Sequence, residues 1–351
     1  MDKKMTRREA LRWLTVAATG LLVACKNVIK PTATAEPTRI PGNTPESMST
    51  STVSAPIATA TPKAENLAKV YLPWDISVAG LMRVYQALDR KASGKVAVKV
   101  SSGEPVGHYF LSPAMIAPLV KEVKGTIVEC NTAYGGARDD TESHLAVMDQ
   151  HGFSGIAPVD VMDAEGTLSL PITGGVHLQE DVVGAHFGNY DFLINLAHFK
   201  GHAMAGFGGV IKNMSIGIAS REGKCLIHTA GRSTTSPWGG DQVEFLESMA
   251  EAAKGIDDFM GERVVYINVM NNLSVDCDCD SSPAVPTMAD IGILASLDPV
   301  AVDQACVDLV YAALDGADLV NRIQTRMGLT TLEHAEAIGL GSRQYDFIEL
   351  G

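Results

Sequence analysis

The sequence predicts an α/β domain with a mostly parallel sheet that is covered by helices on both faces. Short apolar or β-branched runs alternate with longer amphipathic runs, and helix follows strand almost throughout residues 64–351. Polar, glycine-rich segments follow the predicted strands, as expected for loops at the carboxyl edge of a parallel sheet. Because no internal repeat or second linker interrupts this pattern, we predict that residues 64–351 form a single α/β domain.

The predicted elements follow in chain order. The first apolar pattern opens near Leu67, in Lys-Val-Tyr-Leu. Alternation and β-branched content predict strands at 96–100, 126–129, 159–162, 192–197, 264–270 and 291–295. A helical apolar period predicts helices at 114–123, 142–151, 243–260 and 300–314, with two C-terminal helices near 319–326 and 332–338 at one edge of the sheet.

Residues 1–24 have the organisation of an export signal. A basic start precedes an apolar run at 13–24, which is too short to span a bilayer and is typical of a signal peptide. The adjacent Arg7 and Arg8 indicate a twin-arginine signal, and Leu-Val-Ala-Cys resembles a bacterial lipobox that ends in Cys25. An amphipathic first helix of the fold is the alternative. We therefore expect lipidation at Cys25 and a lipid anchor on the extracytoplasmic face of the cell membrane.

Residues 25–63 are predicted to be a disordered linker. Between Pro31 and Pro62 there are six Pro, eight Thr and four Ser, and no aromatic residue. A segment of this composition buries too little apolar surface to offset its ordering entropy. The folded domain would then hang from the membrane on a flexible tether.

The charge excludes one class of partner. The whole chain has a net charge of -13, and residues 64–351 alone hold 19 basic and 37 acidic residues. Such an acidic domain repels phosphate backbones, so nucleic-acid binding is excluded. Six cysteines in 351 residues are also too few for a disulfide scaffold.

Four loops that follow predicted strands carry most of the reactive side chains. They lie at 101–108, 130–136, 198–213 and 271–280, and contain three Cys, three His, two Lys and many Gly. Since the carboxyl ends of parallel strands share one edge, we expect a site there. Its predicted metal ligands, for a metal ion or an iron-sulfur cluster, are Cys277, Cys279, His198, His202 and Cys130.

The cysteines also have an alternative role in disulfides. Cys277 and Cys279 are separated by one residue, and a disulfide between such neighbours closes a very small ring. We therefore expect that, if they are oxidised, they pair with two separate partners such as Cys130 and Cys225. The helical period around Cys306 points its side chain inward, so we expect it to be a small buried apolar residue.

A glycine turn is the predicted anion-binding element. Gly206, Gly208 and Gly209 match no standard nucleotide fingerprint, but they can bring backbone N–H groups close to an anionic ligand before a helix near 211. Lys200 and Lys212 flank this turn and could supply the counter-charge, with solvated surface lysines as the alternative. These five residues are the predicted cofactor-binding set.

An acidic triplet and two histidines are further candidates. The acidic triplet Asp276, Asp278 and Asp280 could hold a hard cation or could be a solvated turn, since it lacks the Gly and Glu of an EF-hand loop. His108 lies in a strand-end loop and His228 lies close to Cys225, so both are carried as site candidates.

Long motifs give the chain a family resemblance. Val-Glu-Cys-Asn-Thr-Ala-Tyr-Gly-Gly at 128–136, the loop at 198–213, Val-Asp-Cys-Asp-Cys at 275–279 and the segment at 290–305 resemble the bacterial and archaeal family called domain of unknown function 362, over about residues 67–345. Many members carry a ferredoxin-type insertion and are described as iron-sulfur proteins. This chain has no cluster motif after Gly-Lys-Cys at 223–225, so the resemblance implies a metal held by the domain's own ligands.

A shorter stretch, His-Ala-Met-Ala-Gly-Phe-Gly-Gly-Val-Ile-Lys at 202–212, is similar to the nickel-pincer lactate racemase family. In that family the lysine that ends the glycine turn anchors the cofactor. The resemblance implies Lys212 as the matching position.

Two functional hypotheses follow. The first is a lipid-anchored, extracytoplasmic protein that binds a metal or iron-sulfur centre and acts in redox or metal-dependent chemistry, with an unidentified small-molecule or redox partner. The second is a non-catalytic lipoprotein that captures a small anion and holds its cysteines in disulfides.

Overall fold

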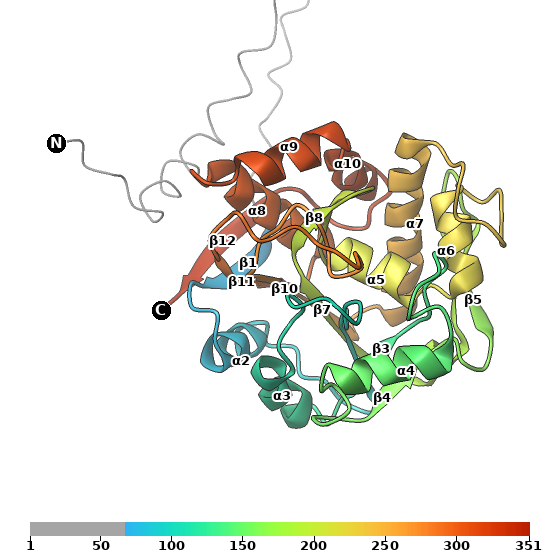
Figure 1. Ribbon diagram of the computed structural model, residues 1–351. Coiled ribbons are helices and arrows are strands. Elements are labelled where there is room, and N and C mark those ends of the chain that lie inside the picture. Colours follow the sequence, from blue (N-terminus) through green and yellow to red (C-terminus); the bar gives the residue numbers. More distant parts are fainter. Residues whose placement is uncertain (1–66) are drawn as a thin grey trace, which may run out of the picture. The chain divides into compact units, whose positions relative to one another are not determined.

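The fold of residues 67–351 is described by a computed structural model, in which strands and helices alternate along the chain (Figure 1). The predicted export signal at 1–24, the lipidation site Cys25 and the linker at 25–63 lie outside the described residues. Residues 67–351 form one unit. Within that unit, no helix is long and apolar enough to cross a membrane.

Eight strands form the central sheet, in the order β12-β1-β11-β10-β7-β2-β3-β4. They are β1 (Ala68–Pro73), β2 (Val96–Lys99), β3 (Thr126–Glu129), β4 (Val159–Val161), β7 (Phe192–His198), β10 (Val264–Met270), β11 (Gly292–Ser296) and β12 (Tyr345–Leu350). The five neighbouring strands from β4 to β10 are parallel, and β12 is parallel to β1. Strand β11 runs antiparallel to both of its neighbours. The predicted mostly parallel sheet is confirmed.

The predicted helices begin close to their predicted positions, whereas α2 and α6 were not predicted. They are α2 (Val78–Ala87), α3 (Pro113–Glu122), α4 (Thr141–Gln150), α5 (Val210–Ile218), α6 (Arg221–His228), α7 (Gln242–Met260), α8 (Pro299–Ala312), α9 (Ala317–Thr325) and α10 (Leu329–Ala337). The start of α8 shows why. The carboxylate of Asp298 accepts the backbone N–H groups of Val300 and Ala301, both at 2.9 Å, and Pro299 has no N–H that needs a partner.

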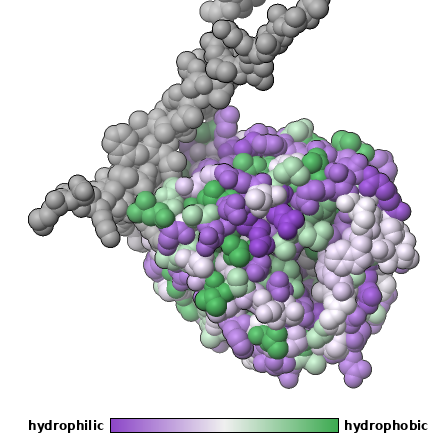
Figure 2. Space-filling view, turned by 45° about the horizontal axis from the view of Figure 1, so that its top comes forward, coloured by the Kyte–Doolittle hydropathy of each residue, from purple (hydrophilic) through white to green (hydrophobic). Residues whose placement is uncertain are grey.

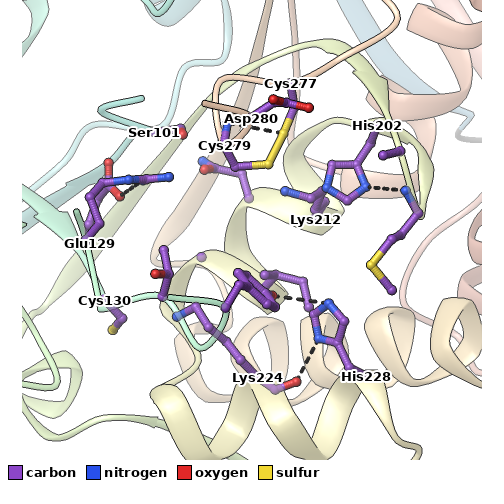
Figure 3. A pocket seen from close by; sticks show the side chains of 18 of the residues that line it. Ser101, Glu129, Cys130, His202, Lys212, Lys224, His228, Cys277, Cys279 and Asp280 are labelled. Carbon is purple, nitrogen blue, oxygen red and sulfur yellow. Dashed lines mark hydrogen bonds and ion pairs between the residues drawn. A yellow bond between two sulfur atoms is a disulfide. The ribbon is translucent and has the colours of Figure 1, made fainter. Parts of the chain in front are cut away.

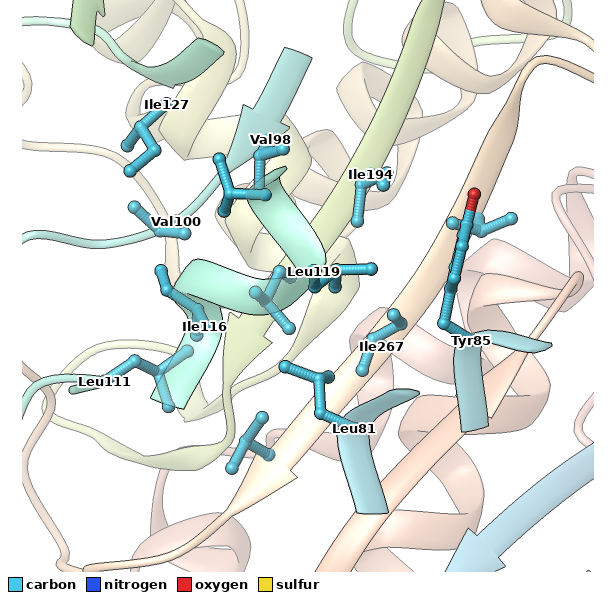
Figure 4. Packing of buried hydrophobic residues seen from close by; sticks show 14 of the residues in the cluster. Leu81, Tyr85, Val98, Val100, Leu111, Ile116, Leu119, Ile127, Ile194 and Ile267 are labelled. Carbon is cyan, nitrogen blue, oxygen red and sulfur yellow. The ribbon is translucent and has the colours of Figure 1, made fainter. Parts of the chain in front are cut away.

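One face of the sheet is packed entirely with apolar side chains. Helices α2 and α3 cover it, and their Leu81, Ile116 and Leu119 belong to one apolar cluster with alternate residues of the strands beneath (Figure 4). Val98 and Ile267 are among these strand residues and are fully buried. Each such side chain contributes roughly 1.5–3 kcal/mol through its transfer from water. This face therefore supplies much of the stability of the domain.

The opposite face is also buried, but it carries polar side chains. Helices α5 and α8 cover it, as Figure 1 shows for α5. Lys99, Asn195 and Asn268 alternate with the apolar residues of their strands and point to this side, where all three are buried. The amide of Asn195 donates to the backbone oxygen of Val210 at 2.9 Å, at the start of α5. Polar groups thus tie this face of the sheet to the helix above it.

Two small hairpins and a second core complete the domain. The hairpins pair β5 (Thr167–Pro171) with β6 (Glu180–Gly184), and β8 (Lys200–His202) with β9 (Gly206–Gly208). Helix α7 packs against α5, α6 and α10 to form the second apolar cluster. The two C-terminal helices do not cover an edge of the sheet as predicted. Helix α9 lies on the β8–β9 hairpin and α10 lies on α7, because those surfaces accept their apolar stripes, which include Leu319 and Leu332.

Candidate functional site

A pocket of about 250 Å³ opens at the carboxyl ends of the parallel strands. It is lined by residues at the ends of β2 and β3, by the β8–β9 hairpin, by α5 and α6, and by the loop that follows β10. After β2 the chain proceeds outward to β3 and β4, whereas β7 and β10 lie on the other side of β2. The pocket therefore occupies a topological switch point, where open α/β sheets bind their ligands. The surface of this part of the domain is hollowed in the space-filling view (Figure 2).

Three lysines line the pocket. Lys99 comes from β2, Lys212 from α5 and Lys224 from α6, and Lys99 and Lys224 are almost fully buried. Burial, opposed by the charge of Glu129, lowers the pKa of Lys99 to about 8. Burial also lowers the pKa of Lys212 to about 8, and the charges of Lys99 and Arg138 add to this effect. The pocket thus gathers three lysines and Arg138, whose charge is offset only in part by Glu129, Asp276 and Asp280 in the same lining.

Lys212 differs from the other two lysines in its contacts. The ammonium of Lys99 donates to the side-chain oxygen of Asn213 at 3.1 Å and to the backbone oxygen of Val100. That of Lys224 donates to the backbone oxygen of Ala219. Within residues 67–351, the ammonium of Lys212 has no hydrogen-bond or ion-pair partner, and it points into the pocket between the cysteines and His202 (Figure 3). Its three N–H donors are available for a ligand.

A buried ion-pair network forms one wall. Arg138 contacts Glu104 at 2.8 Å and Glu129 at 3.2 Å. Burial would raise the pKa of Glu129, but the hydrogen bond from His144 and the charges of Lys99 and Arg138 lower it well below its usual value. Arg138 engages both of these carboxylates, so the charge of Glu129 offsets that of Lys99 only in part.

Two neutral imidazoles face the pocket. His202 accepts the backbone N–H groups of Met204 and Ala205 at its Nδ1 atom, at 3.2 and 2.9 Å. Burial lowers its pKa well below the usual value, so its single proton is on Nε2. Burial also lowers the pKa of His228 to about 4. Its Nδ1 atom donates to the oxygen of Lys224 at 2.8 Å, which leaves Nε2 to accept the hydroxyl of Tyr134 at 3.1 Å.

Cys277 and Cys279 form a disulfide with each other at the mouth of the pocket. The expectation that these neighbours would need separate partners is wrong. The backbone N–H of Asp280 donates to the oxygen of Cys277 at 3.0 Å, and this turn brings the two Cα atoms to 5.3 Å. That distance lies in the usual range for disulfides, roughly 4.4–6.8 Å. Cys130 and Cys225, their predicted partners, are free and buried.

His198 and Lys200 lie behind the cysteines rather than in the pocket. The two oxygens of Asp278 accept hydrogen bonds, one from Nδ1 of His198 at 2.8 Å and one from the ammonium of Lys200 at 2.5 Å. The Nε2 atom of His198 lies 2.7 Å from the backbone oxygen of Asn271, so both ring nitrogens face acceptors. All three side chains are buried. This network holds in place the turn at 276–280 that carries both cysteines, called the cysteine turn below. It offers no free ligand atom.

The remaining cysteines and acidic residues also have internal partners. The thiol of Cys130 donates to the oxygen of Ile218 at 3.1 Å, and burial raises its pKa to about 12, so it is not a thiolate. Asp276 pairs with Arg322 at 3.0 Å, which argues against a hard-cation site in the acidic triplet. Of the two histidines that the sequence offered as further site candidates, His228 lines the pocket and His108 does not.

The glycine turn brings backbone N–H groups toward a carboxylate of the protein itself. Asp303 of α8 accepts the N–H groups of Val210 and Ile211 at 2.9 and 3.0 Å, which are the first N–H groups of α5. A Cβ atom at Gly209 would lie 2.2 Å from this carboxylate. Gly206 has φ +79° and lies against the backbone of Gly328. The predicted anion cradle of Gly206, Gly208 and Gly209 is therefore filled from within, and of the predicted set Lys212 alone faces the pocket.

One His/Cys group is arranged closely enough to hold a metal ion. Single ligand atoms of His202, Cys277 and Cys279 lie within 4.8 Å of one another. The structure thus brings together three of the five predicted metal ligands, and separates His198 and Cys130 from them. Before these atoms can bind a metal, the disulfide has to be reduced to thiolates and Nε2 of His202 has to lose its proton.

Sequence reasoning missed most of the charged pocket residues, namely Lys99, Lys224, Glu129 and Arg138, and it also missed the neutral Tyr134. Lys99 was inside a predicted strand, and a lysine in a strand with both faces covered is a signal of a buried functional charge. Arg138 and Lys224 follow no local pattern, because their partners are distant in the sequence.

The fold and the site define an α/β protein with a cationic pocket at the switch point of its sheet. The sequence matches the family model described as Domain of unknown function (DUF362) over residues 96–308, more than half of the chain. The chain therefore belongs to this family, as its motifs predicted. No curated protein matches the sequence.

Two solved structures are similar at low identity. The lactate racemase apoprotein from Thermoanaerobacterium thermosaccharolyticum is 15% identical with a TM-score of 0.41, covering 70% of this chain and 57% of that one. A crystal structure of a Thermotoga maritima protein is 12% identical with a TM-score of 0.37, covering 74% of this chain and 58% of that one. This chain thus spans less than two thirds of the length of either protein. Nothing about its activity follows from these similarities.

Proposed function

We propose that this protein binds a small organic anion in the pocket formed by β2, α5, α6 and the cysteine turn. One observation carries the proposal: three lysines converge on a single pocket, and Lys212 has no partner within residues 67–351. Burial is the main cause of the lowered pKa values of Lys99 and Lys212, and the counter-charge around each ammonium does not offset it. A bound carboxylate would supply that charge and would accept the N–H donors of Lys212.

The rest of the lining supports an organic anion over an inorganic one. Aromatic and aliphatic side chains, including Tyr134, Phe245 and Ile216, face the same pocket as the lysines. Trp238 stands at the rim with 61% of its surface exposed. A volume of about 250 Å³ lies just below the roughly 300–1,000 Å³ of pockets for drug-sized ligands. The ligand class that fits is a small carboxylate with an apolar part.

A metal or iron-sulfur centre is the second candidate, and the group of His202, Cys277 and Cys279 favours it. Reduction of the disulfide would release two soft thiolate ligands. An iron-sulfur cluster would need further thiolates. Cys130 also lines the pocket, but its buried thiol donates to the backbone oxygen of Ile218, and Cys225 and Cys306 are buried outside the pocket. We therefore rank metal-dependent or redox chemistry below anion capture.

The proposed location follows from the N-terminal sequence alone. We propose that the chain is exported, lipidated at Cys25 and held on the extracytoplasmic face of the cell membrane by its linker. Replacement of Cys25 by Ala should release the protein from the membrane fraction. Retention of the variant in that fraction would contradict the anchor.

Calorimetric titration with benzoate, succinate and inorganic phosphate tests the anion proposal, and benzamide is the neutral counterpart of benzoate. We expect benzoate to bind and benzamide not to bind. Lys212→Met should weaken benzoate binding at least about tenfold, the loss of about 1.4 kcal/mol that one charge-assisted contact supplies. Lys121→Met is the matched control, because Lys121 is exposed on α3 across the sheet. Equal affinity of both variants, or no binding of any anion, would contradict the proposal.

A further inference from the structure

The disulfide of the cysteine turn is placed for chemistry and poorly placed for stabilisation. It links residues only two positions apart, and a crosslink that closes so short a loop removes little entropy from the unfolded chain. Cys279 is exposed, Cys277 is partly exposed, and both line the cationic pocket. Accessible disulfides are the labile and catalytic ones, whereas structural disulfides resist reduction.

We infer that the Cys277–Cys279 disulfide is a thiol–disulfide exchange centre for small thiols that carry a carboxylate. The inference rests on the proposed function, because the same lysines would bind the carboxylate. Figure 3 shows the arrangement, with the disulfide on one side of the pocket and Lys212 and Lys224 facing the same space. A ligand whose carboxylate contacts Lys212 can present a sulfur atom to the disulfide.

The two sulfur atoms are not equivalent. The backbone N–H of Cys279 donates to the Sγ atom of Cys277 at 3.2 Å. This contact favours negative charge on Cys277, which makes its sulfur the better leaving group. The Sγ atom of the exposed Cys279 is therefore the expected point of attack.

The exchange proceeds in two balanced steps. A thiolate RS⁻ attacks Cys279 Sγ, a new S–S bond forms between R and Cys279, and the Cys277–Cys279 bond breaks to leave the Cys277 thiolate. A second RS⁻ attacks the sulfur of R in this mixed disulfide, which forms RSSR and releases the Cys279 thiolate. The small thiols are oxidised by two electrons, and the protein disulfide is the oxidant that is reduced to two thiols.

Charge provides a sharp test of specificity. The chain as a whole carries a net charge of -13, which repels an anionic thiol and attracts a cationic one. Three aspartates, at 276, 278 and 280, flank the cysteines; Asp276 pairs with Arg322, and Asp278 pairs with His198 and Lys200. Preference for an anionic thiol would therefore have to arise from the pocket lysines. A surface disulfide without a carboxylate site would show the reverse preference.

The experiment compares 3-mercaptopropionate, neutral 3-mercaptopropanol and cationic cysteamine as reductants of the purified full-length protein at low ionic strength. Quenched alkylation and mass spectrometry follow Cys277 and Cys279, with rates expressed per thiolate. We expect 3-mercaptopropionate to react at least about tenfold faster than 3-mercaptopropanol, equivalent to about 1.4 kcal/mol. Cysteamine should be the slowest. The trapped mixed disulfide should be on Cys279.

Variants assign the preference to the pocket. Lys212→Met should bring the rate ratio of the anionic and neutral thiols close to one, and Lys121→Met should leave it unchanged. A ratio of one or less in the wild-type protein, or an unchanged ratio in Lys212→Met, would overturn the inference.

A parallel titration separates this inference from the anion proposal. Benzoate should bind a Cys277→Ser/Cys279→Ser double variant as it binds the wild type, because the lysines remain. If benzoate binds both proteins but the thiols show no charge preference, the exchange centre is refuted and anion capture stands. If benzoate binds neither protein, the proposed function itself fails.

Discussion

The two faces of the central sheet bury side chains of opposite character, although the same strands supply both. Toward α2 and α3 these strands present Val98, Ile194 and Ile267, which belong to the apolar cluster of that face. Toward α5 and α8 the neighbouring positions are Lys99, Asn195 and Asn268, and all three are buried. Burial of a polar or charged group costs free energy unless the group is fully paired. The difference indicates that one face stabilises the domain and the other positions a site.

The polar face is also incompletely satisfied, as expected for a functional region. The amide nitrogen of Asn268 donates to Asp303 at 2.7 Å, while its buried oxygen has no partner within residues 67–351. Burial raises the pKa of Asp303 to about 6. These features hold α5, and with it Lys212, at the pocket. Stability is thus given up where the ligand site is built.

The largest expected effect is on the apolar face. Ile267→Ala should lower the free energy of unfolding by about 2–5 kcal/mol, because it leaves a cavity in a closely packed core. Benzoate affinity of the folded variant should equal that of the wild type. Urea unfolding and calorimetry measure the two quantities. A loss of benzoate affinity in the folded Ile267→Ala variant would contradict the division of roles between the two faces, because it would show that the apolar face also positions the pocket.

A smaller effect of the opposite sign is expected on the polar face. The folded-state pKa of Lys212 is about 8, below its ordinary value of 10.5, so its charged form destabilises the folded protein. Lys212→Met should therefore raise the free energy of unfolding at pH 7, by about 1–3 kcal/mol.

The pH dependence has a definite sign. The unfolded chain binds more protons than the folded chain between about pH 8 and pH 10.5, so this lysine makes wild-type stability rise with pH across that window. The stability gain of Lys212→Met should shrink over the same window. Urea unfolding at pH 7 and pH 9.5 measures both effects. A variant that is less stable than the wild type at pH 7 would show that Lys212 has a structural role.

Much of the fold could be predicted because its signals are local. The runs at 126–129 and 264–270 are the observed bounds of β3 and β10, and the predicted helices agree with α3, α4, α7 and α8 within two residues. Strands β1 and β12 lie beside each other from opposite ends of the chain, and no local pattern indicates that pairing. The antiparallel direction of β11 is likewise set by its connection rather than by its composition.

The site was correctly predicted at the carboxyl edge of the sheet, but some of its predicted residues lie elsewhere. Of the predicted site residues, the pocket is lined by Cys130, His202, Lys212, Cys277 and Cys279. His198 and Lys200 occur in the same 198–213 loop motif as His202 and Lys212. They are buried against Asp278, which lies 80 residues after His198 in the sequence. Spacing alone cannot separate residues that face a ligand from those that hold the loop. The predicted metal or iron-sulfur centre stays a prediction.

Proton uptake on ligand binding tests the central claim most directly. If benzoate binds beside Lys99 and Lys212, it should raise their pKa values above about 8, and the complex should take up protons at pH 8 but far fewer at pH 6.5. Calorimetric titrations in two buffers of different ionisation enthalpy, such as Tris and HEPES, measure this uptake. The account predicts a buffer-dependent heat at pH 8 that decreases in Lys212→Met. A heat that does not depend on the buffer at pH 8 would contradict it.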